Sequence, residues 1–122
     1  SARTRSRARL ESMIDAALRG TSVTAVLIGA ETANRFWVQH EIVASWENGK
    51  GLLGVRIHGI RDKRTKMRSR PGPSPFEDLW VVDAAGYDVE LEDVVPTYDW
   101  LRDDGYSNFA DWIEEAALDA GR

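Results

Sequence analysis

Apolar residues recur along the first half of this chain in two patterns, each typical of a different secondary structure. Residues 7–19 carry one apolar stripe at helical spacing, formed by Leu10, Met13, Ile14, Ala17 and Leu18. Residues 23–29 and 52–58 are nearly continuous apolar runs, which is typical of strands covered on both faces. A segment of helical length, 34–48, separates them and is followed by Gly49. This order predicts a βαβ unit with two adjacent parallel strands and a right-handed crossover.

The pattern weakens in the second half of the chain. Residues 59–75 hold six Lys or Arg and three of the four prolines, which predicts an exposed loop that is poorly ordered without a ligand. Residues 79–82 predict a short strand, and the acidic segment 84–96 predicts no regular element. We therefore expect the regular core to come mainly from the βαβ unit and the flanking helices, in a three-layer α/β sandwich.

A last helix is predicted over residues 109–120, with Ser107 or Asn108 as its N-cap. Its inward face is expected to hold Phe109, Trp112, Ile113, Ala116, Ala117 and Ala120.

The composition is that of a small globular protein with one domain. The chain has 122 residues, of which 43% are hydrophobic and 30% charged. It has no cysteine, which excludes disulfides, thiolate metal sites and a cysteine nucleophile, and favours a cytoplasmic location. The longest unbroken apolar stretch, residues 25–28, is far shorter than the roughly 20 residues of a membrane helix. No membrane partner is expected.

Charge is distributed unevenly along the chain. Residues 1–70 carry a net charge of +8 and residues 71–122 a net charge of -12, although the whole chain has only -4. Either the two halves attract each other in the fold, or the basic half faces an anionic small molecule. Nucleic acid is not an expected partner, because the isoelectric point is about 5.2 and no aromatic residues interleave the basic runs.

Candidate site residues follow the carboxyl ends of the two predicted strands, where open parallel sheets bind ligands. Gly29 and Thr32 follow the first strand, and His58 ends the second. On the helix between them, Trp37 and Glu41 are four residues apart and therefore share one stripe. A carboxylate beside an aromatic wall can hold ribose hydroxyls and stabilise an oxocarbenium-like centre, although such a pair is also common as a packed ring and a solvated acid.

Three longer strings make the assignment more specific. They are residues 21–32 (TSVTAVLIGAET), 35–42 (RFWVQHEI) and 49–58 (GKGLLGVRIH), and shorter matching pieces occur at 73–76, 98–100, 103–108 and 112–114. Together they resemble the prokaryotic TIR-like domain family and, within it, the branch of the Thoeris anti-phage defence system.

The resemblance implies a flavodoxin-like fold and an enzyme that cleaves NAD, which is a substrate and not a resident cofactor. Glu41 matches the family's catalytic glutamate in the Trp-x-x-x-Glu pattern, and Trp37 matches its aromatic residue. For Trp37, packing within the fold and contact with the ligand are both open. In the Thoeris branch the activity resembles that of a cyclase, whose cyclic ADP-ribose product signals to a separate effector. The resemblance also allows a homo-oligomer. It does not determine whether cleavage of NAD is followed by hydrolysis or by cyclisation.

The family begins with a strand that has no counterpart here. We therefore expect residues 1–122 to be one TIR-like domain that lacks its N-terminal strand and helix, and the strand at Val23 to have a free edge.

Two other functions stay open: a non-catalytic scaffold, and a nucleotide-binding switch. His58 is interpreted as a structural imidazole bonded to a loop carbonyl, with a ligand contact as the alternative, and His40 is expected to point away from Glu41. Two histidines do not predict a metal site.

Overall fold

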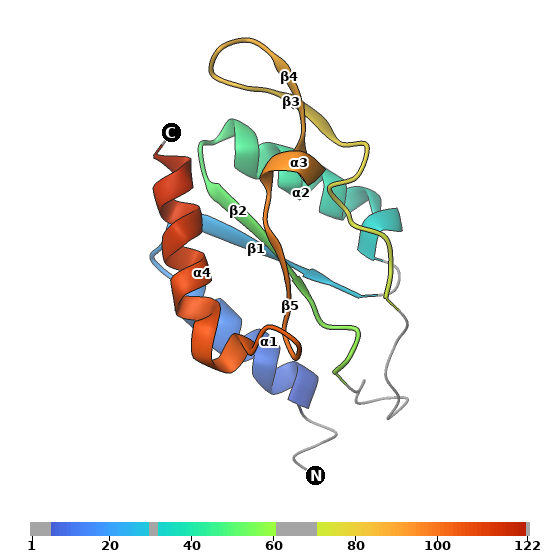
Figure 1. Ribbon diagram of the computed structural model, residues 1–122, viewed down its shortest axis with the longest axis vertical. Coiled ribbons are helices and arrows are strands. Elements are labelled where there is room, and N and C mark those ends of the chain that lie inside the picture. The colour runs from blue at the N-terminus through green and yellow to red at the C-terminus, as the bar shows by residue number, and fades with distance from the viewer. Residues whose placement is uncertain (1–5, 30–31, 61–70, 122) are drawn as a thin grey trace.

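The computed structural model describes residues 6–29, 32–60 and 71–121 (Figure 1). Its elements follow the order α1 (Ser6–Leu18), β1 (Val23–Ile28), the 3₁₀ turn η1 (Thr32–Asn34), α2 (Phe36–Glu47), β2 (Gly51–Arg56), β3 (Trp80–Val82), β4 (Asp88–Glu90), α3 (Leu91–Val94), β5 (Thr97–Asp99) and α4 (Gly105–Ala120). No helix in these ranges is long and apolar enough to cross a membrane.

The predicted βαβ unit is confirmed. β1 and β2 pair in parallel, with Val23 opposite Gly51 and Ile28 opposite Arg56, and α2 connects them. β5 adds a third parallel strand beside β2, which gives the sheet the order β1-β2-β5. β3 and β4 form a separate antiparallel hairpin, which stands beyond the end of the main sheet (Figure 1).

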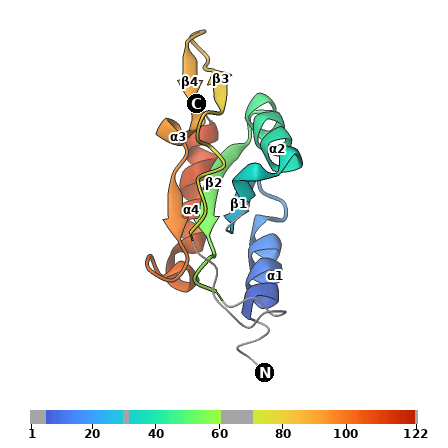
Figure 2. The ribbon, with the colours of Figure 1, turned by 90° about the vertical axis from the view of Figure 1, so that its right-hand side faces the viewer.

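Helices cover both faces of the sheet, which confirms the three-layer prediction. α1 and α4 lie on one side of the strands and α2 and α3 on the other (Figures 1 and 2). The first face buries one apolar cluster, whose largest members include Leu10, Leu53, Val55, Trp100 and Trp112. The second face buries another, with Ile28, Val38, Ile42, Phe76 and Leu91. Such doubly covered strands account for the continuous apolar runs in the sequence.

The last helix begins four residues earlier than predicted. α4 starts at Gly105, and its N-cap is Asp104 in the left-handed conformation (φ 49°), with no capping bond from a side chain. Asn108 lies inside the helix and donates to the carbonyls of Asp103 and Asp104, both at 3.0 Å. The early start depends on Gly105, because a Cβ there would lie 2.1 Å from the ring of Trp100. Ala117, expected to face inward, is exposed.

Two further expectations for the second half are wrong in part. The segment 84–96 is not irregular, since it contains β4 and α3. The carboxylate of Asp83 shapes the preceding turn by accepting the N–H groups of Ala85 and Tyr87 at 2.9 Å. In the segment 59–75, Ile60 and Ser74 are buried and not exposed. The six basic residues of that segment fall within 61–70, outside the described residues, and so does the expectation of poor order there.

β1 lies at the edge of the sheet, as expected for the strand at Val23. Among the described strands only β2 pairs with it, so its outer edge faces no other strand. An edge strand has backbone N–H and C=O groups that point away from the sheet. This edge borders the candidate site.

Candidate functional site

A cavity of about 270 Å³ lies between the outer edge of β1 and the first turns of α2. Its lining consists of Thr24, Ala25, Val26, Leu27, Thr32, Arg35, Trp37, Val38, Glu41 and Ile42. Side chains alternate between the two faces of a strand, so four consecutive strand residues can line one cavity only if it lies along the strand edge. The cavity therefore runs along the edge of β1 and reaches Thr32 and Arg35 beyond its carboxyl end, whereas the sequence predicted a site only beyond the carboxyl ends of β1 and β2.

α2 supplies both the floor and the wall of this cavity. At about 100° per residue, the four lining positions 37, 38, 41 and 42 span an arc of about 140° on the helix. Val38 and Ile42 are buried against the sheet, whereas Trp37 is 57% exposed and Glu41 is also exposed. The predicted arrangement of two neighbouring stripes is thus confirmed, with the aromatic ring and the carboxylate both on the side that faces the cavity.

The carboxylate of Glu41 has no competing partner among the residues that the structure describes. Within the described part of the chain it makes no ion pair, and no hydrogen bond of its side chain is observed. Among the described lining residues, only Glu41 and Arg35 carry a charge. The carboxylate is therefore available to interact with a positively charged group in the cavity.

Thr32 lines the cavity and contacts Gly29, the residue that follows β1. The N–H of Gly29 donates to the Thr32 hydroxyl at 2.7 Å, and that hydroxyl donates to the Leu27 carbonyl at 3.4 Å. The Thr32 hydroxyl thereby forms hydrogen bonds with two backbone groups at the end of β1, and it can still accept one further hydrogen bond. Gly29 is positioned by this contact but does not line the cavity. The intervening residues, Ala30 and Glu31, lie outside the described ranges.

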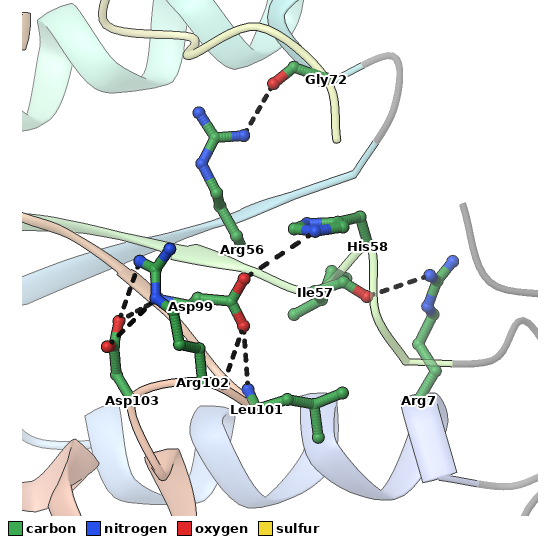
Figure 3. A network of polar contacts seen from close by, with 9 residues as sticks. All are labelled: Arg7, Arg56, Ile57, His58, Gly72, Asp99, Leu101, Arg102 and Asp103. Atoms are coloured by element: carbon green, nitrogen blue, oxygen red, sulfur yellow. Dashed lines mark hydrogen bonds and ion pairs between the residues drawn. The ribbon is translucent and has the colours of Figure 1, made fainter. Parts of the chain in front are cut away.

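His58 belongs to a different polar cluster, at the carboxyl ends of β2 and β5 (Figure 3). Its Nε2 lies 3.8 Å from Oδ2 of Asp99, which is an ion pair when the imidazole is protonated, and its Nδ1 is buried without a hydrogen-bond partner. His58 does not line the cavity that contains Glu41. The expected loop carbonyl is not its partner, because β5, which the sequence did not predict, brings a carboxylate next to it.

Asp99 is itself held by several contacts in this cluster. Its Oδ1 accepts the N–H groups of Leu101 and Arg102, both at 3.1 Å, and its own N–H donates to Oδ2 of Asp103 at 2.7 Å. The Asp99 N–H, followed by the Arg102 side chain, lowers the pKa of Asp103 below its usual value. The carboxylates here have hydrogen-bond partners within the protein, unlike Glu41 among the described residues.

Trp37, Glu41 and Thr32, predicted as site residues, line the cavity, and the free edge of the strand at Val23 was also expected. Neither a site role for Arg35 nor the position of the cavity along this edge was predicted from the sequence, although a cation two residues before Trp37 is a signal that the sequence contains. The role of the β1 edge has no local signal, because it depends on which strands pair. Within the described ranges, no group of three His, Cys, Asp or Glu is placed to hold a metal ion.

Two comparisons with known proteins match parts of the sequence that include the residues of this cavity. The family model described as Thoeris protein ThsB, TIR-like domain, matches residues 1–62, which include β1, α2 and β2. The chain is also similar to a candidate cyclic ADP-D-ribose synthase, ThsB1, from Bacillus cereus. The two sequences are 34% identical over 139 aligned positions, which cover 85% of this chain and 72% of the relative.

Proposed function

The chain belongs to the Thoeris ThsB family with a TIR-like domain, and from this premise we propose that it cleaves the nicotinamide–ribose bond of NAD and recloses the product as a cyclic ADP-ribose. The observation that carries the proposal is the position of Glu41. It lies beside Trp37 on the wall of the cavity and has no internal partner among the described residues. The name of the relative supports the cyclic product, because the relative is described as a candidate cyclic ADP-D-ribose synthase.

The reaction places specific demands on this carboxylate. When the bond between C1′ of the ribose and the pyridinium nitrogen breaks, the electron pair leaves with neutral nicotinamide and positive charge develops on the ribose. A fixed carboxylate next to C1′ stabilises this charge more than it stabilises the ground state. A nucleophilic group of the same ADP-ribose then bonds to C1′ in cyclisation, whereas water does so in hydrolysis.

Trp37 and the apolar floor would hold the departing ring. An indole face attracts a cationic ring, and Val38 and Ile42 exclude water from below. The cavity volume of about 270 Å³ is slightly below the roughly 300–1,000 Å³ of typical small-molecule sites, so it fits one nucleotide half of a dinucleotide. In this proposal the nicotinamide half lies inside and the cyclic product leaves to act on the separate effector of the Thoeris system.

The test follows free nicotinamide and the nucleotide product after incubation with NAD. We expect wild-type protein to release nicotinamide, with a cyclic product separable from linear ADP-ribose by chromatography. Glu41→Gln keeps the shape of the side chain and removes its charge, so release should fall on the order of a hundredfold or more. Glu47→Gln is the matched control, because Glu47 is an exposed carboxylate at the end of the same helix that does not line this cavity. Equal release by Glu41→Gln and wild type would contradict the proposal.

A non-catalytic scaffold is the second candidate, and one observation favours it. Trp80 and Val82 lie on the same face of the β3–β4 hairpin and are each 58% exposed, which is a large apolar surface for a free monomer. This function, which would include a homo-oligomer, predicts no release of nicotinamide by the wild type and a concentration-dependent mass in solution. Replacement of both residues by Thr would then lower the mass.

A further inference from the structure

Arg35 is, beside Glu41, the other charged residue among those described that line the cavity, and its guanidinium has no partner among the described residues. It immediately precedes α2 and is exposed at the cavity. Its backbone is fixed, since its N–H donates to the Thr32 carbonyl at 3.2 Å and its own carbonyl accepts the N–H of Val38 at 3.1 Å. No ion pair or hydrogen bond of its side chain is observed among the described residues. The backbone therefore holds a cation with five unused donors at the mouth of the cavity.

Two other arginines, Arg7 and Arg56, have structural roles because their guanidinium groups bind backbone carbonyls of distant segments. Arg7 donates to the carbonyls of Ile57 and Ile60, and Arg56 donates to the carbonyl of Gly72 at 2.7 Å (Figure 3). Each of these guanidinium groups joins two segments that are far apart in the sequence. Arg35 joins none, so its side chain does not account for the stability of the fold.

The charges of the cavity have a fixed order along α2. Arg35 and Glu41 are six residues apart, which corresponds to about 9 Å along a helix axis, and Trp37 lies between them. A pyridinium dinucleotide also carries opposite charges at two separate places, a positive ring and a negative pyrophosphate, with one ribose between them. Only one direction of binding pairs both charges, because the reverse direction places the pyrophosphate against the Glu41 carboxylate.

We propose that Arg35 binds the pyrophosphate of the dinucleotide and thereby sets the direction in which it enters the cavity, with the nicotinamide ribose at Glu41. The inference rests on the proposed NAD cleavage and names the residue that orients its substrate. The planar guanidinium can donate two parallel N–H bonds to phosphate oxygens, which a point charge cannot do. Arg35 is thus a substrate-binding residue at the anionic end of the ligand, and Glu41 acts at the cationic end.

The experiment measures by calorimetry the binding of two ligands, each of which has only one of the two charged groups of the dinucleotide. ADP-ribose has the pyrophosphate and no pyridinium, whereas nicotinamide riboside has the pyridinium and no phosphate. For Arg35→Ala we expect the Kd of ADP-ribose to rise at least tenfold, because a charged hydrogen bond is lost, and the Kd of nicotinamide riboside to stay within twofold. Arg35→Lys should recover part of the loss. Arg9→Ala is the matched control, since Arg9 is an exposed arginine on α1 that does not line the cavity.

The outcomes separate this inference from the proposed function. If wild-type protein releases nicotinamide and Arg35→Ala has an unchanged KM for NAD and an unchanged Kd for ADP-ribose, the assignment of Arg35 is wrong. Equal weakening of both ligands, or failure of the wild type to bind ADP-ribose, would also overturn it. If ADP-ribose binding depends on Arg35 while the wild type releases no nicotinamide, the cleavage proposal fails and the pyrophosphate contact stands.

Discussion

The two polar regions of this protein differ in whether their charges already have partners. At the carboxyl ends of β2 and β5, Asp99 contacts His58 and accepts two backbone N–H groups, and its own N–H is bound by Asp103. In the cavity beside β1, Arg35 and Glu41 have no partner among the described residues. Polar groups that are bound to one another hold the fold, whereas charges without such partners that face one cavity suit a charged ligand. We therefore interpret the first region as structural, and it is the second region to which the proposed binding and catalysis belong.

The largest difference in stability is expected between two glycines, one from each region. At Gly105 a Cβ would lie 2.1 Å from the Trp100 ring, whereas at Gly29 it would meet only the Thr32 hydroxyl at 3.7 Å, an ordinary contact. Gly105→Ala should therefore lower the free energy of unfolding by about 2–3 kcal/mol, since overpacking displaces a buried indole. Gly29→Ala should change it by less than about 0.5 kcal/mol. Urea titration of both variants checks this, and equal effects would break the comparison.

A second, smaller difference is expected between two carboxylates. Asp99→Ala removes the acceptor of two N–H groups and the partner of His58, and it should cost about 1.5–2 kcal/mol of unfolding free energy. Glu41→Ala removes an exposed carboxylate with no observed partner and should cost less than about 0.5 kcal/mol. Thermal and urea unfolding of the two variants give the values. A Glu41 variant as unstable as the Asp99 variant would mean that Glu41 is a structural residue.

The smallest expected effect is a pH dependence from Tyr98, on β5. Burial, followed by the charges of Glu115 and Asp119, raises the pKa of its phenol above the usual 10.0. The folded state then retains this proton at a pH where the unfolded chain has lost it, so stability decreases as the pH rises above 10. Tyr98→Phe should flatten this part of the stability curve. An unchanged slope between pH 9.5 and 11, measured by urea unfolding, would contradict the assignment of this effect to Tyr98.

The sequence predicted the parts of the fold that depend on local pattern. β1, α2 and β2 were predicted because their apolar runs and helical stripe are long and uninterrupted. β5 was missed because Thr97–Asp99 has no apolar run and becomes a strand only by pairing with β2. The early start of α4 was missed because it depends on the tight contact of Gly105 with Trp100.

The same distinction applies to the candidate site. Trp37 and Glu41 share a helix, so their spacing alone placed them together. His58 was expected to bond to a loop carbonyl, and its neighbour Asp99 was missed because it lies 41 residues further along the chain. The free edge of β1 was expected only from the resemblance to the family, because it depends on strand pairing, which local sequence does not determine. Long-range pairing is thus what the sequence pattern did not supply.

One measurement tests most directly the central claim that catalysis belongs to the cavity beside β1. It compares the rate of nicotinamide release from NAD per folded molecule between Glu41→Gln and Asp99→Ala. The folded fraction of each variant is taken from its unfolding curve. The account predicts that Glu41→Gln is fully folded and loses on the order of a hundredfold or more of the rate, because only its charge acts on the ribose. It predicts that Asp99→Ala unfolds more readily and keeps the wild-type rate per folded molecule. Retained release by Glu41→Gln, or a comparable loss of rate in folded Asp99→Ala, would contradict the assignment of catalysis to the cavity beside β1.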